Sequence, residues 1–155
     1  MPLTSEDNPL ENAKEELKRV DHLIYVSLKY TRTCDIFKNI IARLINAIEF
    51  GIDAILRRLE EENRIFEVPA QPGAKCNTLK EHIQDERILQ MVDFYLLLRQ
   101  MNRTDFSRER EYRRHVTMTM IIDGKPVEVN IDSITQFFKD SQGYLEHVDK
   151  YLQRP

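Results

Sequence analysis

The apolar positions in the first part of the chain recur at the spacing of an amphipathic helix. Asn8 can cap such a helix, Pro9 suits its first position, and Glu11 follows the cap by three residues, as in a capping box. The apolar residues on this face are Leu10, Ala13, Leu17, Val20, Ile24 and Leu28. Residues 31–35 are weak helix formers, and Thr33 is suited to cap a second helix. One continuous helix through this segment is the alternative.

A longer apolar stripe predicts a second helix. Its members are Phe37, Ile40, Ile41, Leu44, Ile48, Ile52, Ile55 and Leu59. Gly51 lies inside the stripe and costs a helix about 1 kcal/mol relative to Ala, which indicates a point where another helix crosses closely. Asn63 is a candidate for the left-handed residue that follows a helix end.

Residues from about 64 to 77 are predicted to form a linker, because two prolines and Gly73 lie within five residues. Thr78 and Glu81 then have the spacing of a second capping box and predict the start of a third helix. The apolar residues of this helix are Ile88, Val92, Tyr95 and Met101.

The period changes from helical to alternating between about residues 112 and 131, which predicts a β-hairpin. Asp123-Gly124 is a two-residue turn between two alternating runs. This turn pairs Ile122 with Lys125, Met120 with Val127, Met118 with Val129 and Val116 with Ile131. It also pairs Thr119 with Glu128 and Thr117 with Asn130 on the polar face. The turn and the pattern agree on this register.

A final helix is predicted after the hairpin, capped by Asp132 or by Ser133 with Gln136. The apolar residues on its inner face are Ile134, Phe137, Phe138, Leu145, Val148 and Leu152. Together, the elements predict one mainly α domain over residues 1–155. It is a bundle of about four helices with a β-hairpin inserted before the last one.

The hairpin also predicts self-association, because a two-stranded hairpin is only marginally stable alone. Its apolar face must lie on a helix of the same chain or on a second copy. Methionine is frequent at adaptable association surfaces. We therefore expect a homodimer whose interface includes Met118, Met120, Val127 and Val129.

Composition narrows the classes of partner and cofactor. The 155 residues carry a net charge of −3, so there is no general attraction to nucleic acid or to anionic membranes. Cys34 and Cys76 form no disulfide framework, and no apolar run approaches the roughly 20 residues of a membrane span. We expect a cytoplasmic protein with free thiols. The spacing of His22, His82 and His147 matches no metal motif, so no cofactor or metal is expected.

Six arginines lie between residues 99 and 116, despite the acidic net charge. If the third helix continues through this segment, one arc of its surface carries several of them and could contact an anion or RNA. These residues are Arg99, Arg103, Arg110, Arg113 and Arg114. In the alternative interpretation the segment "RTDFS" breaks the helix, with Ser107 or Asp105 as a cap, and the arginines are scattered and solvated. Pairs such as Glu109 with Arg113 would then form locally.

The segment "REYRRH" contains Arg110 and, after four intervening residues, His115; Arg108 fits a variant with six intervening residues. A compact helical protein with this spacing resembles the HEPN family. That resemblance implies a small, usually dimeric helical bundle, many members of which are RNases in prokaryotic toxin or defence systems. It also implies that Arg110 and His115 act on the phosphate and the 2′-hydroxyl of RNA.

Two features of this segment differ from the HEPN pattern. Glu111 follows the arginine, where the family often has Asn, Asp or His. His115 also begins a predicted strand, where the register extends to a pairing with Asp132 that would steady the helix cap. The sequence therefore predicts a non-catalytic, self-associating interaction module of the cytoplasm. The alternative is a HEPN-like RNA-binding protein or metal-independent RNase that uses Arg110 and His115.

Overall fold

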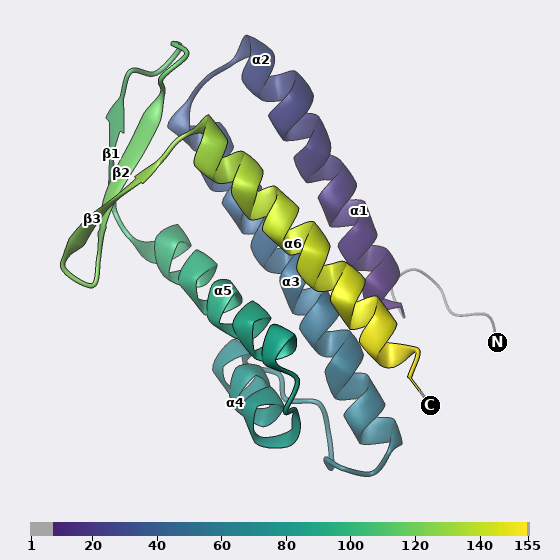
Figure 1. Ribbon diagram of the computed structural model, residues 1–155. Coiled ribbons are helices and arrows are strands. Elements are labelled where there is room, and N and C mark those ends of the chain that lie inside the picture. Colours follow the sequence, from purple (N-terminus) through teal and green to yellow (C-terminus); the bar gives the residue numbers. More distant parts are fainter. Residues whose placement is uncertain (1–7, 155) are drawn as a thin grey trace.

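The computed structural model describes residues 8–154 and confirms a mainly α fold with a small antiparallel sheet before the last helix (Figure 1). The helical elements are α1 (Pro9–His22), a π-helical turn η2 (Leu23–Ser27), α2 (Leu28–Tyr30), α3 (Cys34–Glu61), α4 (Pro72–His82), α5 (Glu86–Arg103) and α6 (Ile131–Leu152). The strands are β1 (Phe106–Glu109), β2 (Thr117–Ile122) and β3 (Lys125–Val129).

Both predicted caps in the first part of the chain are confirmed. The side chain of Asn8 accepts a hydrogen bond from the Glu11 backbone N–H at 3.3 Å. Thr33 Oγ1 accepts one from Ile36 N–H at 3.4 Å. The chain is extended at Thr31 and Thr33, so two separate helices form in place of one continuous helix.

The π-helical turn η2 interrupts the first helix and keeps its apolar stripe facing the bundle. Val20, Ile24 and Leu28 are all buried, although each follows the previous one by four residues. In a regular α-helix, each step of four residues rotates the side chain about 40° past a full turn. A π turn holds more residues per turn and takes back part of this rotation.

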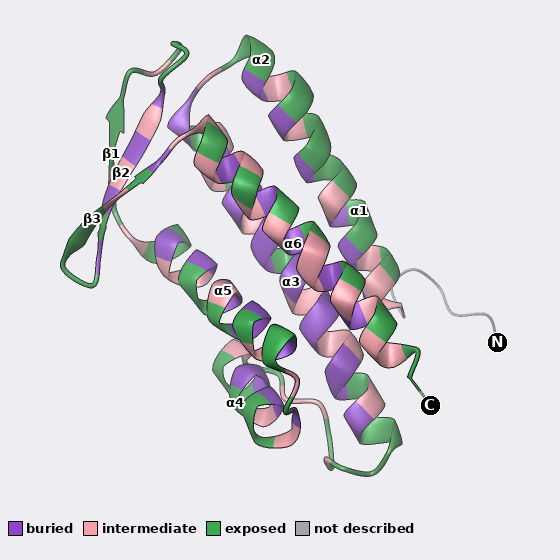
Figure 2. Cartoon of the chain, in the orientation of Figure 1, coloured by how far each residue is buried: buried purple, intermediate pink, exposed green. Residues whose placement is uncertain are grey.

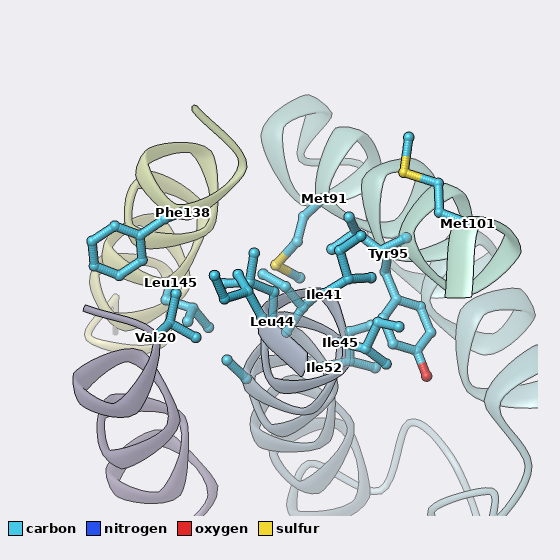
Figure 3. Close-up of a cluster of buried hydrophobic side chains, with 14 of the residues drawn as sticks. Val20, Ile41, Leu44, Ile45, Ile52, Met91, Tyr95, Met101, Phe138 and Leu145 are labelled. Carbon is cyan, nitrogen blue, oxygen red and sulfur yellow. The ribbon is translucent and has the colours of Figure 1, made fainter. Parts of the chain in front are cut away.

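Helix α3 is the centre of the bundle and packs against α1, α4, α5 and α6 (Figures 1 and 2). Its buried residues join side chains of α1, α5 and α6 in one core (Figure 3). The close crossing predicted at Gly51 is confirmed: a Cβ atom there would lie 2.6 Å from Leu145 Cδ2 of α6. Asn63, directly after the helix, has a φ of 58°, as predicted.

The predicted linker is wrong at its C-terminal end, because residues 72–77 belong to α4. Pro72 occupies the start of this helix, where its missing N–H costs nothing. Thr78 caps no helix; it lies inside α4 and its hydroxyl donates to the Ala74 carbonyl oxygen at 2.8 Å. The predicted third helix is therefore two helices, and Asp85 caps the second, α5.

The hairpin register is confirmed for four pairs: Met118 with Val129, Thr119 with Glu128, Met120 with Val127 and Ile122 with Lys125. A third strand, β1, pairs antiparallel with β2 and was not predicted. Beyond Val129 the register does not continue, because Asn130 caps α6 in a reciprocal capping box with Ser133. The predicted pairs of Val116 with Ile131 and of Thr117 with Asn130 are therefore wrong. The predicted caps, at Asp132 or at Ser133 with Gln136, are also wrong, because the cap is Asn130.

The apolar face of the hairpin is covered by the helices of its own chain. Met118, Met120 and Val129 are buried, with Met120 only 2% exposed, and Val127 is partly buried. Strand β2 contacts α3 and α5, and β3 contacts α6. Three of the four side chains expected at a homodimer interface, Met118, Met120 and Val129, are therefore already covered within one chain.

None of the helices between residues 8 and 154 has both the length and the apolar character that crossing a membrane requires.

Candidate functional site

The arginines of residues 99–116 do not share one helical arc, because α5 ends at Arg103. The Thr104 hydroxyl donates to the Gln100 carbonyl oxygen at 2.7 Å, and the chain then becomes extended. The interpretation in which the helix breaks is therefore confirmed, although Asp105 and Ser107 cap no helix, since β1 begins at Phe106.

The structure places these arginines in three different locations. Arg99 and Arg103 line a polar hollow between α3 and α5, where Arg99 also lies over the Tyr95 ring. Arg108, on β1, pairs with Asp35 at 2.8 Å and lowers the pKa of that carboxyl group through this hydrogen bond. The remaining arginines, Arg110, Arg113 and Arg114, lie in the connection between β1 and β2. We call residues 110–115 the tip loop.

The tip loop is held in an unusual backbone conformation. Arg110 and Tyr112 have φ values of 55° and 66°, in the left-handed region. Each such residue costs roughly 1–2 kcal/mol, so surrounding contacts must offset this strain. The Cys34 N–H at the start of α3 donates to Glu111 Oε2 at 3.3 Å, and the Tyr112 N–H donates to the Arg32 carbonyl oxygen at 2.6 Å. The loop is thus fixed against the junction of α2 and α3.

The negative charge of Glu111 is balanced within this arrangement. Arg108 Nη1 lies 3.6 Å from Glu111 Oε1, and the other carboxylate oxygen faces the N-terminus of α3. Beneath it, the Cys34 thiol donates to the Thr117 carbonyl oxygen at 3.5 Å. Burial, and then the Glu111 carboxylate, raise the pKa of this thiol, which disfavours a reactive thiolate.

A polar groove of about 450 Å³ opens beside the tip loop. We call it the tip groove. Its lining residues are Arg110, Arg114, His115, Thr117, Glu128, Asn130, Ile131 and Asp132. Cations come from the tip loop, and carboxylates come from β3 and the first turn of α6. The groove therefore has basic and acidic groups on different elements.

The basic groups of the tip loop are not engaged by other side chains. Within residues 8–154, the side chains of Arg110, Arg113, Arg114 and His115 form no hydrogen bond, ion pair or ring contact. Two tyrosines stand nearby: Tyr112 is 76% exposed in the same loop, and Tyr30 is 78% exposed at the end of α2. Figure 1 shows α2 and the β1–β2 connection at the same end of the molecule. This end therefore combines free cations with exposed aromatic rings.

His115 and Asp132 line the same groove, but they do not form the predicted cross-strand pair. Strand β3 ends at Val129, and the groove separates the tip loop from the first turn of α6. The backbone carbonyl oxygen of His115, and not its ring, accepts a hydrogen bond from Thr117 Oγ1 at 2.9 Å. Arg110 and His115 nevertheless line one groove.

Sequence reasoning missed a second polar cluster, which joins α3, α4 and α5. Lys75 Nζ lies 2.8 Å from Asp53 Oδ1 and 3.5 Å from Glu49 Oε2, and the Tyr95 hydroxyl donates to Glu49 Oε1. Figure 3 shows the Tyr95 hydroxyl directed away from the labelled apolar side chains. Burial alone would lower the pKa of Lys75, but the two carboxylates outweigh it and hold the pKa above its usual value. The sequence signal that could have indicated this cluster is the pair of Glu49 and Asp53, which lie four residues apart and therefore on one face of α3.

His147 also has a partner that the sequence did not indicate. Its Nε2 lies 2.9 Å from both carboxylate oxygens of Asp85, the residue that caps α5. Burial opposes ionisation of Asp85, but the Ile88 N–H and His147 outweigh it and lower the pKa of the carboxyl group. The pair connects α6 to the start of α5. Across residues 8–154, no three side chains of His, Cys, Asp or Glu converge as metal ligands.

Comparisons of the chain with protein-family models, with curated proteins and with solved structures found no match.

Proposed function

We propose that this protein is a non-catalytic interaction module whose partner is single-stranded RNA, bound at the tip loop. The observation that carries this proposal is the set of unpaired side chains of Arg110, Arg113 and Arg114 on a loop with a fixed backbone. Other cations of the described chain, such as Lys75 and Arg108, are engaged by carboxylates. Unpaired guanidinium groups are suited to phosphate oxygens.

The exposed tyrosines favour a single strand over a duplex. Proteins that bind single strands combine a basic surface with aromatic rings on which unstacked bases lie. Tyr30 and Tyr112 provide such rings at the end of the molecule that carries the free arginines. Arg32 adds a further cation, and its Nε is buried without a hydrogen-bond partner in the described chain.

The proposal places the partner at the tip and not on the hairpin. Met118, Met120 and Val129, which motivated the expected homodimer, are covered by α3, α5 and α6. Self-association would therefore have to use a different surface. RNA binding needs no second subunit, because the tip groove is formed by one chain.

We propose a non-catalytic role because, among residues 8–154, no side chain contacts the imidazole of His115 and fixes its orientation. A general acid or base must be held within hydrogen-bond reach of the proton it transfers. Glu128 and Asp132 line the same groove and would repel a phosphate held at its centre, which cleavage by Arg110 and His115 would require. Binding alone requires only that phosphates lie at the tip-loop arginines. In the HEPN-like alternative, Arg110 and His115 are the catalytic pair. The experiment below distinguishes this alternative from non-catalytic binding.

The test is fluorescence anisotropy of a labelled single-stranded RNA, measured over a range of salt concentrations. Three phosphate contacts, from the three free arginines, give a slope of log affinity against log salt of about −2. The double substitution Arg110→Glu with Arg114→Glu should weaken binding by more than about tenfold and leave the fold intact, since both residues are exposed.

The matched control is Lys139→Glu with Lys150→Glu on α6, which changes the net charge equally at exposed positions outside the tip. Equal loss in both double variants, or no binding by the unmodified protein, would refute the proposal. RNA cleavage by the unmodified protein that is lost in His115→Ala would replace it with the RNase alternative. We expect intact RNA and near-normal affinity in His115→Ala.

A further inference from the structure

The tip groove is not a simple anion site, because its charges are balanced. Arg110 and Arg114 line it together with Glu128 and Asp132. A phosphate placed centrally in the groove would meet two carboxylates as well as two guanidinium groups. A ligand that satisfies this lining must be anionic at one end and must present hydrogen-bond donors at the other. A nucleotide has this division, between its phosphate and its base.

We propose that the tip groove selects guanine, with the Glu128 carboxylate accepting from the base and the tip-loop arginines holding the adjacent phosphate. This inference rests on the proposed function, because it assigns the base that the bound RNA presents. The groove volume of about 450 Å³ lies within the range of small-molecule sites. Ile131 adds an apolar side chain to an otherwise polar lining, which suits the face of a base.

The pattern of donors on the bases decides which of them a carboxylate prefers. A carboxylate has two acceptor oxygens and no donor. Guanine presents two neighbouring donors on its Watson–Crick edge, the ring N1–H and the exocyclic N2 amino group. Adenine and cytosine present one amino donor beside a ring acceptor, and uracil presents one N–H between two carbonyl acceptors. The bidentate fit is therefore available to guanine alone among the four bases.

Glu128 is better suited than Asp132 to accept hydrogen bonds from the Watson–Crick edge of guanine. Asp132 lies in the first turn of α6, where the partial positive charge of the helix N-terminus already stabilises its carboxylate. Glu128 is exposed on β3, directly opposite Thr119 in the ladder, and its carboxylate has no ion-pair partner in the described chain. It also has a longer side chain with which to reach a base in the groove.

The test compares short uridine oligomers that carry guanosine, adenosine, cytidine or uridine at one central position. The guanosine oligomer should bind about tenfold more tightly than the others, as for a good bidentate contact to a base. An oligomer with inosine at that position, which lacks the 2-amino group, should lose most of this preference. Glu128→Gln should abolish it without weakening the all-uridine oligomer. Glu109→Gln, an equal charge change on exposed β1, should leave it unchanged.

The outcomes separate the two proposals. If no oligomer binds, the proposed function fails and the guanine inference fails with it. If all four oligomers bind equally, and binding depends on Arg110 and Arg114, the proposed function stands and the guanine inference is overturned. A preference for another base, or a guanosine preference that persists in Glu128→Gln, also overturns it. Thermal melting of Glu128→Gln checks that the fold is retained.

Discussion

Substitution of Gly51 by alanine tests the closest helix crossing in the bundle. A Cβ atom at this position would lie 2.6 Å from Leu145 Cδ2 and 4.0 Å from Val148 Cγ2. The first distance is shorter than any ordinary carbon–carbon contact, so Leu145 must move or α3 and α6 must separate. Leu145 is buried in the core shared by these helices.

Two effects of opposite sign decide the magnitude. Replacing glycine by alanine inside a helix stabilises the folded state by about 1 kcal/mol through backbone propensity. Overpacking a core costs about 1–3 kcal/mol, and about 2 kcal/mol is reasonable for a contact with one flexible side chain. We therefore expect Gly51→Ala to lower the free energy of unfolding by about 1 kcal/mol.

The effect of Gly51→Ala on the free energy of unfolding should change sign when Leu145 is shortened to alanine. In a Leu145→Ala background the clash is removed, so Gly51→Ala should raise the free energy of unfolding by about 1 kcal/mol. The coupling between the two positions is then about 2 kcal/mol, within the range for residues in contact. Gly73→Ala is the control, since no atom beyond the neighbouring residues and backbone of its own helix lies within 4 Å of the Cβ position, and the change should be stabilising.

Urea denaturation, followed by circular dichroism, of the two single variants, the double variant and Gly73→Ala would measure these differences. If Gly51→Ala is equally stabilising in both backgrounds, α3 and α6 do not cross as closely as described.

Two further predictions concern the hairpin face and the acid stability of the bundle. Met120→Lys should lower the free energy of unfolding by about 3 kcal/mol, because the side chain is buried within its own chain. The melting temperature should fall, while the molecular mass measured by light scattering should stay the same. A smaller molecular mass with an unchanged monomer fold would contradict this expectation. Asp85 has a lowered pKa, so its ionised form contributes stability above the unfolded pKa of about 3.9, and this contribution is lost as the pH falls through the folded value. The free energies of unfolding of the unmodified protein and of Asp85→Asn should therefore differ by about 1 kcal/mol near neutral pH and become equal in acid. A difference that stays constant down to about pH 3 would show that the contact with His147 does not depend on charge.

Elements with two agreeing local signals were predictable from the sequence. In the hairpin, the Asp123-Gly124 turn and the alternating apolar pattern require the same register, and the structure has it. In α3, the cap at Thr33 and the long apolar stripe agree in the same way. Such agreement leaves few alternative structures with a buried apolar face.

The missed elements have weak or ambiguous local signals. Strand β1 is only four residues long, three of them exposed, and its pairing with β2 crosses the tip loop. Helix α4 buries only Lys75, Cys76 and Leu79, so it lacks a strong apolar stripe. Pro72 has a fixed φ that suits either a turn or the first position of a helix.

The tip groove was not predictable, although its three basic residues, Arg110, Arg114 and His115, were named from the sequence. Its shape depends on left-handed backbone at Arg110 and Tyr112, which neither residue type favours. It also depends on the hydrogen bond between the Cys34 N–H and Glu111, whose partners are 77 residues apart. Contacts at that separation leave no periodic trace in one sequence.

The position of Cys34 makes its thiol a natural reporter of motion at the tip loop. The thiol is buried and donates to the Thr117 carbonyl oxygen, while the backbone N–H of the same residue donates to Glu111. A reagent can therefore reach the thiol only when that end of the molecule opens. Cys76, the other buried thiol, lies on α4 and becomes accessible when that helix detaches. Local openings of this kind occur independently of global unfolding. The two rates of thiol modification therefore measure two separate openings in the same molecule, and a ligand that closes over the tip loop would slow one and spare the other.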